Sequence, residues 1–220
     1  MKMKACVLIA TRNAHKVEEI HSILGAAIQC LSLRDLPQAP DIVESGTTFA
    51  TNAILKAEGL AAWIAQRSPS PSQLAAFPAW VLSDDSGLEV DALHGAPGVL
   101  SARFASAEFG LSGNAPDAAN NAKLLRLLAS VPADQRTARF RCVLALTPVA
   151  PHPRQPTRTF DGTCEGHIGF VQRGSHGFGY DPLFIPAGFA ESLAQLGETT
   201  KNRISHRSAA LQKLKATWSP

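Results

Sequence analysis

The chain has 220 residues, 45% of them hydrophobic and 18% charged, so it can bury a sizeable core as one large domain or two small lobes. Its 21 basic and 18 acidic residues form no long block of either sign, and the formal net charge of +3 is too mild to indicate nucleic-acid binding, although it suits an anionic small substrate. The four cysteines are isolated and no apolar run is long enough to cross a membrane, so we expect a cytoplasmic protein without a zinc ribbon, a signal peptide or a membrane span.

The first segment predicts a strand, a polar loop and a helix. Residues 5–10 are a continuous apolar run typical of a buried strand. The expected helix has its apolar face at Val17, Ile20, Ile23 and Leu24, its polar face at Glu18, Glu19 and His21, and its end at Gly25. The loop at 11–16 precedes the amino end of this helix, where unpaired N–H groups favour phosphate. It lacks the glycines of a Walker or dinucleotide loop, so an ordinary helix capped by Asn13, with Lys16 as a solvated charge, is an equal alternative.

A second helix is expected after a polar turn at residues 41–49. Its apolar face comprises Phe49, Ala53, Ala57, Leu60, Ala61 and Ile64. Asn52 and Lys56 are four residues apart and share another face, where Lys56 either reaches a phosphate or is an ordinary surface lysine. Residues 66–79 are rich in proline and serine and predict a loop without assigned chemistry.

The stretch from Val81 to Leu88 carries two adjacent carboxylates. An apolar run ends at Leu82 and is followed by Ser-Asp-Asp-Ser-Gly, which predicts a buried strand closed by a turn. In open α/β sheets, ligands bind outside the carboxyl ends of strands, so Asp84 and Asp85 could hold a substrate and a hard cation there. The alternative is an acidic strand-to-turn junction without function. Residues 87–93 alternate apolar with polar, as a half-exposed strand does.

The remaining third of the chain predicts one more helix, two strands, a glycine-rich loop and a final helix. The helix at 115–129 has an apolar stripe at Ala118, Ala122, Leu125 and Leu128. Strands at 137–146 and 157–168 are expected to pair, and the arginines of the first are expected on a solvated face. The loop at 174–182 offers glycines and aromatic rings that either stack on a base or form an ordinary turn. Ser205 is the expected cap of the last helix, with His206 and Arg207 in its first turn.

Each of the polar motifs along the chain is weak evidence alone, but together and in this order they are specific for one protein family. They are Thr-x-Asn-x-x-Lys, Glu-x-Gly-x-Thr-Phe, Ser-Asp-Asp-Ser-Gly-Leu, Gly-Ala-Pro-Gly, Ser-Ala-Arg, Phe-Gly-Tyr-Asp and Ile-Ser-His-Arg. From Val7 to about Leu214 the chain resembles the inosine triphosphate pyrophosphatase family, whose bacterial members are called dITP/XTP pyrophosphatases. The resemblance implies an α/β fold in one domain over residues 1–220, with an elongated mixed β-sheet bent into two lobes, flanking helices and the active cleft between the lobes. It also implies that a homodimer hydrolyses ITP, dITP and XTP to the monophosphate and pyrophosphate with magnesium.

The same resemblance assigns roles to residues. Asp85 is the implied proton acceptor and a metal ligand, and Glu44 is the second metal ligand. The implied substrate-binding residues are Thr11, Arg12, Asn13, Ala14, His15, Lys16, Lys56, Ser86, Phe178, Gly179, Tyr180, Asp181, Lys201, His206 and Arg207. Arg12 and His15 stand where the family often has glycine, and Thr51 replaces a glutamate found in many members, so this chain lacks any metal or water role for a carboxylate there.

The physical chemistry of these residues agrees with that activity. Magnesium takes oxygen ligands and bridges phosphates, and lysines offset the charge of a triphosphate and its leaving group. A donor from Arg207 or His206 would favour a 6-keto purine over adenine, although no residue in the sequence explains how guanine is excluded. Two alternatives are a metal-dependent nucleotide-sugar transferase, which also places paired aspartates after a strand, and an RNA-binding module. The RNA-binding module would need clustered basic residues beside Phe178 and Tyr180, where the sequence has only Arg173.

Overall fold

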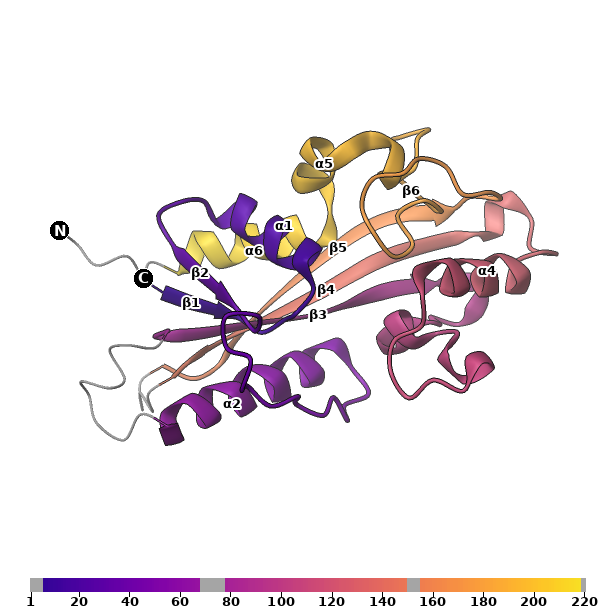
Figure 1. The fold of residues 1–220 in the computed structure, drawn as a ribbon. Helices are drawn as coiled ribbons and strands as arrows, with labels where there is room; N and C mark the ends of the chain where they lie inside the picture. Colours follow the sequence, from indigo (N-terminus) through magenta and orange to yellow (C-terminus); the bar gives the residue numbers. More distant parts are fainter. Residues whose placement is uncertain (1–5, 68–77, 150–154, 219–220) are drawn as a thin grey trace. The chain divides into compact units, whose positions relative to one another are not determined.

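The computed structural model describes residues 6–67, 78–149 and 155–218. Its strands form one six-stranded sheet in the order β2-β1-β3-β4-β5-β6 (Figure 1). The strands are β1 (Cys6–Ile9), β2 (Gln29–Ser32), β3 (Trp80–Val90), β4 (Thr137–Pro148), β5 (Arg158–Ile168) and β6 (Phe184–Pro186). β1 pairs in parallel with β2 and β3, whereas β5 and β6 are antiparallel, so the predicted mixed α/β sheet is confirmed.

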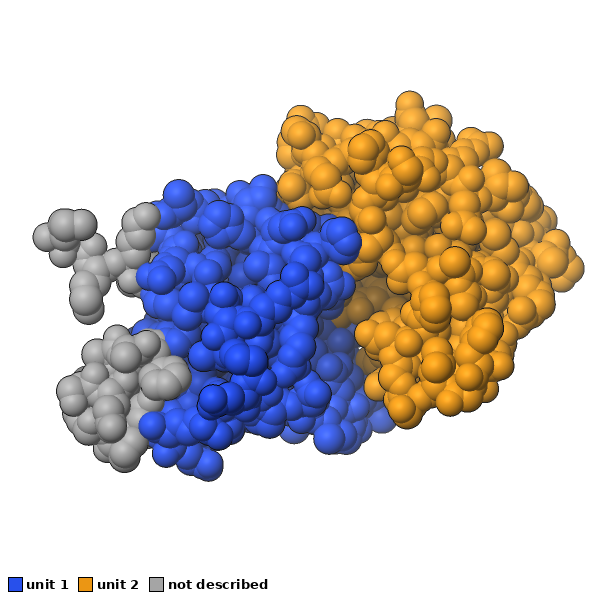
Figure 2. All heavy atoms as spheres, viewed as in Figure 1, with its two compact units in different colours: residues 1–85, 142–161, 210–220 blue, residues 86–141, 162–209 orange. Residues whose placement is uncertain are grey.

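Five α-helices accompany the sheet in the described residues: α1 (Ala14–Leu24), α2 (Phe49–Arg67), α4 (Asp117–Leu127), α5 (Leu193–Ile204) and α6 (His206–Thr217). The chain divides into two compact units, coloured separately in Figure 2. Unit 1 comprises residues 1–85, 142–161 and 210–220, and unit 2 comprises residues 86–141 and 162–209. Among the described residues, no helix has the length and apolar character needed to span a membrane.

In unit 1, helices cover both faces of the parallel strands, with α1 and α6 on one face and α2 on the other (Figure 1). The apolar residues of β1 are fully buried because both faces are covered, as their unbroken hydrophobic run predicted. The predicted apolar face of α2 is confirmed at every position, and Asn52 is buried with it. Glu19 of α1 was predicted on the polar face and is instead 4% exposed.

In unit 2, the predicted apolar stripe of α4 is confirmed at Leu128, which is buried, and at Leu125, which packs against the core, and is wrong at its two alanines. Ala118 and Ala122 are exposed, whereas Asn120, Asn121 and Leu124 are buried. The reason is hydrogen bonding: Asn120 Oδ1 accepts from Ala105 N at 2.8 Å, so this amide satisfies a buried backbone group that an apolar side chain would leave unpaired. Hydrogen bonding by Asn120 therefore contributes to the orientation of α4 together with the burial of Leu124 and Leu128.

The turn predicted after Leu82 is also wrong. β3 continues through both aspartates, Ser86 and Gly87 to Val90, and residues 91–93 form a 3-10 turn instead of further strand. β3 lies between β1 and β4, so backbone hydrogen bonds to its neighbours extend it through polar residues that would otherwise favour a turn. As a result the two carboxylates lie in the middle of the strand.

The other predicted elements hold with small shifts. β4 and β5 are neighbours, as expected, and the thiol and phenyl groups of β4 are buried opposite its arginines. Residues 193–204, which the sequence did not predict as a helix, form α5 with a kink at Gly197. Most of the predicted proline- and serine-rich loop at 66–79 lies outside the described residues, because residues 68–77 are not described, and neither are residues 150–154.

Candidate active-site residues

The amino end of α1 is built around Asn13. Its Oδ1 accepts from the backbone N–H groups of His15 at 2.9 Å and Lys16 at 3.4 Å, which confirms the predicted cap. Arg12 is tied to the Asp41 carboxylate and donates to Ala39 O at 2.9 Å. The guanidinium is therefore held against the segment that precedes α2.

The alternative interpretation of Lys16 as a solvated surface charge is wrong. Its Nζ lies 2.5 Å from Asp84 Oδ1, and the Asp84 side chain is only 1% exposed. The buried thiol of Cys142 on β4 donates to the other oxygen, Oδ2, at 3.3 Å. Asp84 is thus engaged at both oxygens, and it fixes a lysine beside the amino end of α1.

Asp85 differs from its neighbour. Asp85 is buried, with 8% of its surface exposed. Its Oδ2 nevertheless has no hydrogen-bond partner in the described part of the chain. Burial, with a smaller contribution from the negative charge of Glu44, raises the pKa of Asp85 to about 6, although Lys16, Lys56 and weakly Asn52 oppose the shift. Of the two aspartates, Asp85 therefore has the available oxygen and a pKa near neutrality.

The segment before α2 supplies the rest of this cluster. Lys56 Nζ lies 2.7 Å from Glu44 Oε1, and both side chains are partly exposed. Asn52 Oδ1 accepts from Gly46 N at 2.8 Å. A Cβ atom at Gly46 would lie 2.7 Å from that oxygen, so the close approach requires glycine. We call Lys16, Glu44, Lys56, Asp84 and Asp85 the unit 1 cluster.

The unit 1 cluster can be tested for a magnesium site. No group of three or more His, Cys, Asp or Glu side chains is arranged as a metal site in the residues that the structure describes. Magnesium needs only one or two protein carboxylates when phosphates and water complete its coordination. The unpartnered Oδ2 of Asp85 and the nearby Glu44 carboxylate meet that requirement, so the residues fit the metal.

In unit 2, the predicted site residues lie on β3, on the loop before β6, and on α5 and α6. The loop before β6 carries Phe178, Gly179, Tyr180 and Asp181, and the Asp181 carboxylate forms a buried ion pair with Lys201 of α5 at 2.6 Å. The same Asp181 oxygen accepts from Phe178 N at 2.9 Å, and Lys201 Nζ lies 4.4 Å from the centroid of the Phe178 ring. A cation over the face of an aromatic ring is an attractive arrangement, so the ring and the ion pair support each other.

The residues at the start of α6 are also buried. Ser205 Oγ accepts from Ser208 N at 3.1 Å, which confirms the predicted cap. The His206 ring stacks on Phe140 with centroids 4.8 Å apart, and Arg207 Nη2 donates to Ser86 Oγ at 3.1 Å. Arg207 Cζ lies 5.9 Å from the centroid of Phe178, so the structure brings Arg207, Ser86, Phe178 and Lys201 into one group, which we call the unit 2 cluster.

Sequence reasoning missed three residues that hold these clusters. Cys142 contacts Asp84, and two residues of α4, Asp117 and Asn121, bind the backbone of Gly179. The adjacent asparagines at 120 and 121 gave the signal, because asparagine is a weak helix former that is favoured where its amide bonds backbone groups.

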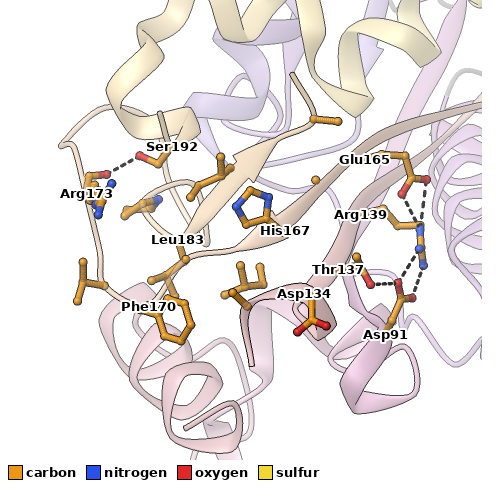
Figure 3. A pocket seen from close by; sticks show the side chains of 18 residues that line it. Asp91, Asp134, Thr137, Arg139, Glu165, His167, Phe170, Arg173, Leu183 and Ser192 are labelled. Atoms are coloured by element: carbon orange, nitrogen blue, oxygen red, sulfur yellow. Dashed lines mark hydrogen bonds and ion pairs between the residues drawn. The ribbon is translucent and has the colours of Figure 1, made fainter. Parts of the chain in front are cut away.

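A separate pocket of about 750 Å³ lies in unit 2 and contains none of the predicted site residues (Figure 3). Its wall includes Arg139, which forms ion pairs with Asp91 at 2.8 Å and Glu165 at 3.0 Å. The hydrogen bonds that Asp91 accepts from Arg139 and Thr137 lower the pKa of this carboxyl below its usual range. The predicted solvated arginine is therefore bound into a charged network at the pocket edge.

Comparison with known proteins identifies the family. The model of the Ham1 family matches residues 7–217. A dITP/XTP pyrophosphatase from Exiguobacterium sibiricum is 48% identical over 96% of this chain and 95% of its own length, and one from Geobacillus kaustophilus is 45% identical over 96% and 93%. The solved structure of a HAM1 protein from Coxiella burnetii has a TM-score of 0.77 at 34% identity and covers 96% of this chain and 97% of that one. The chain therefore belongs to the Ham1 family.

Proposed function

We propose that this protein hydrolyses deaminated purine nucleoside triphosphates, namely ITP, dITP and XTP, to the nucleoside monophosphate and pyrophosphate. The observation that carries the proposal is Asp85, a buried carboxylate with an available oxygen and a pKa of about 6, beside Lys16 and Lys56. Relatives over 40% identical and nearly full-length carry the name dITP/XTP pyrophosphatase. Their names give no support to a nucleotide-sugar transferase.

The unit 1 cluster binds the triphosphate in this proposal. Lys16 and Lys56, together with the positive end of the α1 dipole, offset the negative charge of the phosphates and of the departing pyrophosphate. Asp84 orients Lys16 through their 2.5 Å contact, and Glu44 orients Lys56 through theirs. Each lysine is thereby held in place before the substrate arrives.

Asp85 acts as the general base. Its Oδ2 takes a proton from the water that attacks the α-phosphorus, and a pKa near 6 lets the carboxylate be ionised at neutral pH while remaining a useful base. Glu44 and Asp85 would also hold a magnesium ion, which when bound neutralises phosphate charge and lowers the pKa of coordinated water. Magnesium dependence is part of the proposal.

The unit 2 cluster recognises the base. Phe178 presents a ring for stacking on the base. The guanidinium of Arg207 can donate to the 6-keto oxygen of a deaminated purine, whereas in adenine it would face an amino group, which is also a donor. Lys201 of α5 lies over the Phe178 ring and pairs with Asp181 of the same loop, so it helps to hold that ring, and His206 stacks on Phe140 at the start of α6. Asp85 and Ser86 are consecutive residues of β3, so the chain itself links the two clusters.

A substrate panel tests the proposal. Purified protein with magnesium is given ITP, XTP, dITP, GTP and ATP, and pyrophosphate and orthophosphate are measured separately. We expect pyrophosphate and monophosphate from the first three and little turnover of the last two. Orthophosphate with a nucleoside diphosphate left behind would place attack at another phosphorus and reject the proposal. Omitting magnesium, with EDTA present, is expected to stop turnover.

We propose further that the protein acts in the cytoplasm as a homodimer. Phe170 and Val171, 58% and 56% exposed, lie at the pocket of unit 2, whose rim carries the acidic Asp134 and the basic Arg173 (Figure 3). An isologous contact places the same patch on both subunits, so an apolar patch with both charge signs can complement itself. Light scattering with size-exclusion chromatography tests this, and Phe170→Glu is expected to give monomers if this surface forms the contact.

A further inference from the structure

Helix α4 holds the loop before β6 through hydrogen bonds to both backbone polar groups of one loop residue, Gly179. Gly179 N donates to Asp117 Oδ2 at 2.6 Å, and Gly179 O accepts from Asn121 Nδ2 at 3.0 Å. The two side chains are four residues apart and therefore lie on the same face of the helix. Gly179 stands between Phe178 and Tyr180, so these two bonds fix the backbone from which both aromatic side chains project.

Asp117 suits this task because of its place in the chain. It is the first residue of α4, where a carboxylate is stabilised by the helix dipole, and a hydrogen bond to an ionised acceptor is about twice as strong as a neutral one. Its negative charge also adds to the effect of burial in raising the pKa of Tyr180.

Asn121 suits a purely packing role poorly. It is 2% exposed, and its Oδ1 accepts no hydrogen bond from the residues that the structure describes. A buried amide oxygen without a partner is costly, so an apolar side chain would fit a site that needed only packing. What the amide contributes is two bonds from Nδ2, a closer one to Gly179 O at 3.0 Å and a longer one to Gln172 Oε1 at 3.5 Å.

The loop needs such support because of its own backbone. Gly177 and Gly179 both have positive φ, at 76° and 63°, and a Cβ atom at Gly177 would lie 2.1 Å from Asp181 Oδ2. Glycine permits this conformation but does not restrict the chain to it. Within the loop Phe178 N donates to Asp181 Oδ2 at 2.9 Å, and the bonds from Asp117 and Asn121 to Gly179 add a restraint from outside the loop on the position of the Phe178 ring.

We infer that Asp117 and Asn121 are positioning residues for base recognition, acting through Gly179 to hold Phe178 where it stacks on the purine. This inference rests on the proposed function, because it takes the Phe178 loop as the base-binding element. Neither residue touches the substrate in this role. The clamp formed by Asp117 and Asn121 should therefore influence how tightly the base binds, and not how fast the phosphoanhydride bond is cut.

Product inhibition separates base binding from phosphate binding. Inosine monophosphate engages the base site, whereas pyrophosphate engages only the phosphate site. For Asp117→Ala we expect KM for ITP and the inhibition constant of inosine monophosphate to rise about tenfold, the effect of losing one charge-assisted hydrogen bond. The kcat and the inhibition constant of pyrophosphate should stay within about twofold of wild type.

Two further variants sharpen the test. Asp117→Asn keeps an oxygen that can accept from Gly179 N, so it should restore most of the lost affinity. Arg126→Ala is the control: Arg126 lies on the same helix, and its replacement removes only an ion pair with Glu108, so this variant should behave as wild type. Asn121→Ala should resemble Asp117→Ala, and since Asp117 is exposed, its variants remain folded and informative even where Asn121→Ala is unstable.

The outcomes are distinct. Unchanged KM and unchanged inhibition by inosine monophosphate in Asp117→Ala would overturn the inference, and so would an equal rise for monophosphate and pyrophosphate, which indicates general loosening. If wild type releases no pyrophosphate from ITP, the proposed function fails. Calorimetric binding of inosine monophosphate to the same variants then decides the role of the clamp without any turnover.

Discussion

Replacement of Asp85 by asparagine should make the metal-free protein more stable while removing most of its activity. Burial raises the pKa of Asp85 to about 6, from 3.8 for an aspartate in an unfolded chain. At pH 8 the folded protein must keep a buried carboxylate ionised, and two pKa units correspond to about 3 kcal/mol, which is an upper value for the gain in unfolding free energy. Asparagine preserves the shape without that charge.

The sign of the pH dependence follows from the raised pKa. Well below pH 3.8 the carboxyl is protonated in both folded and unfolded chains, so it costs nothing. As pH rises toward 6 the unfolded chain releases its proton first, and wild type loses stability relative to the variant until the difference levels off above pH 6. Urea unfolding of both proteins in EDTA at pH 4.5 and pH 8 measures this difference.

Glu18→Gln is the matched control, because Glu18 is exposed on α1 in the same unit. Its unfolding free energy should follow that of wild type at both pH values. A stability difference between wild type and Asp85→Asn that does not grow with pH would refute the reasoning. Turnover in the folded variant should fall by about 10² to 10⁴, as for loss of a general base, and near-normal activity would move the role to Asp84 or Glu44.

Other variants test the remaining contacts. Arg207→Ala should lose ITP activity sharply while ATP activity stays near its low baseline, so kcat/KM for the two substrates converges; an unchanged ratio would assign Arg207 to phosphate instead. Magnesium at pH 8 should raise the Tm of wild type more than that of Asp85→Asn, and equal shifts would remove Asp85 from the metal site. Cys142→Ala, which removes the donor 3.3 Å from Asp84 Oδ2, should lower the unfolding free energy by about 1 kcal/mol, and Cys142→Ser should recover part of it. Asn120→Leu should destabilise more strongly, by about 1–3 kcal/mol in urea unfolding, because Ala105 N is left buried without an acceptor.

The sequence determined the elements whose residues carry a clear period. The buried run of β1, the cap and apolar face of α1, and the apolar face of α2 are local properties of hydrophobic spacing and capping chemistry, and the structure has them as predicted. The family resemblance rested on short ordered motifs, and the comparisons confirmed it.

Only the tertiary structure decided what the polar residues contact. The aspartates after Leu82 favour a turn locally, but hydrogen bonds from neighbouring strands extend β3 through them. The spacing of α4 favoured its alanines for burial, yet backbone groups of other segments required Asn120 and Asn121 inside. Which aspartate is engaged and which has an available oxygen depended on Lys16, Cys142 and Glu44, residues far apart in the sequence. Hydrogen bonds and charges between distant segments are set by the folded chain as a whole, so local sequence patterns do not encode them.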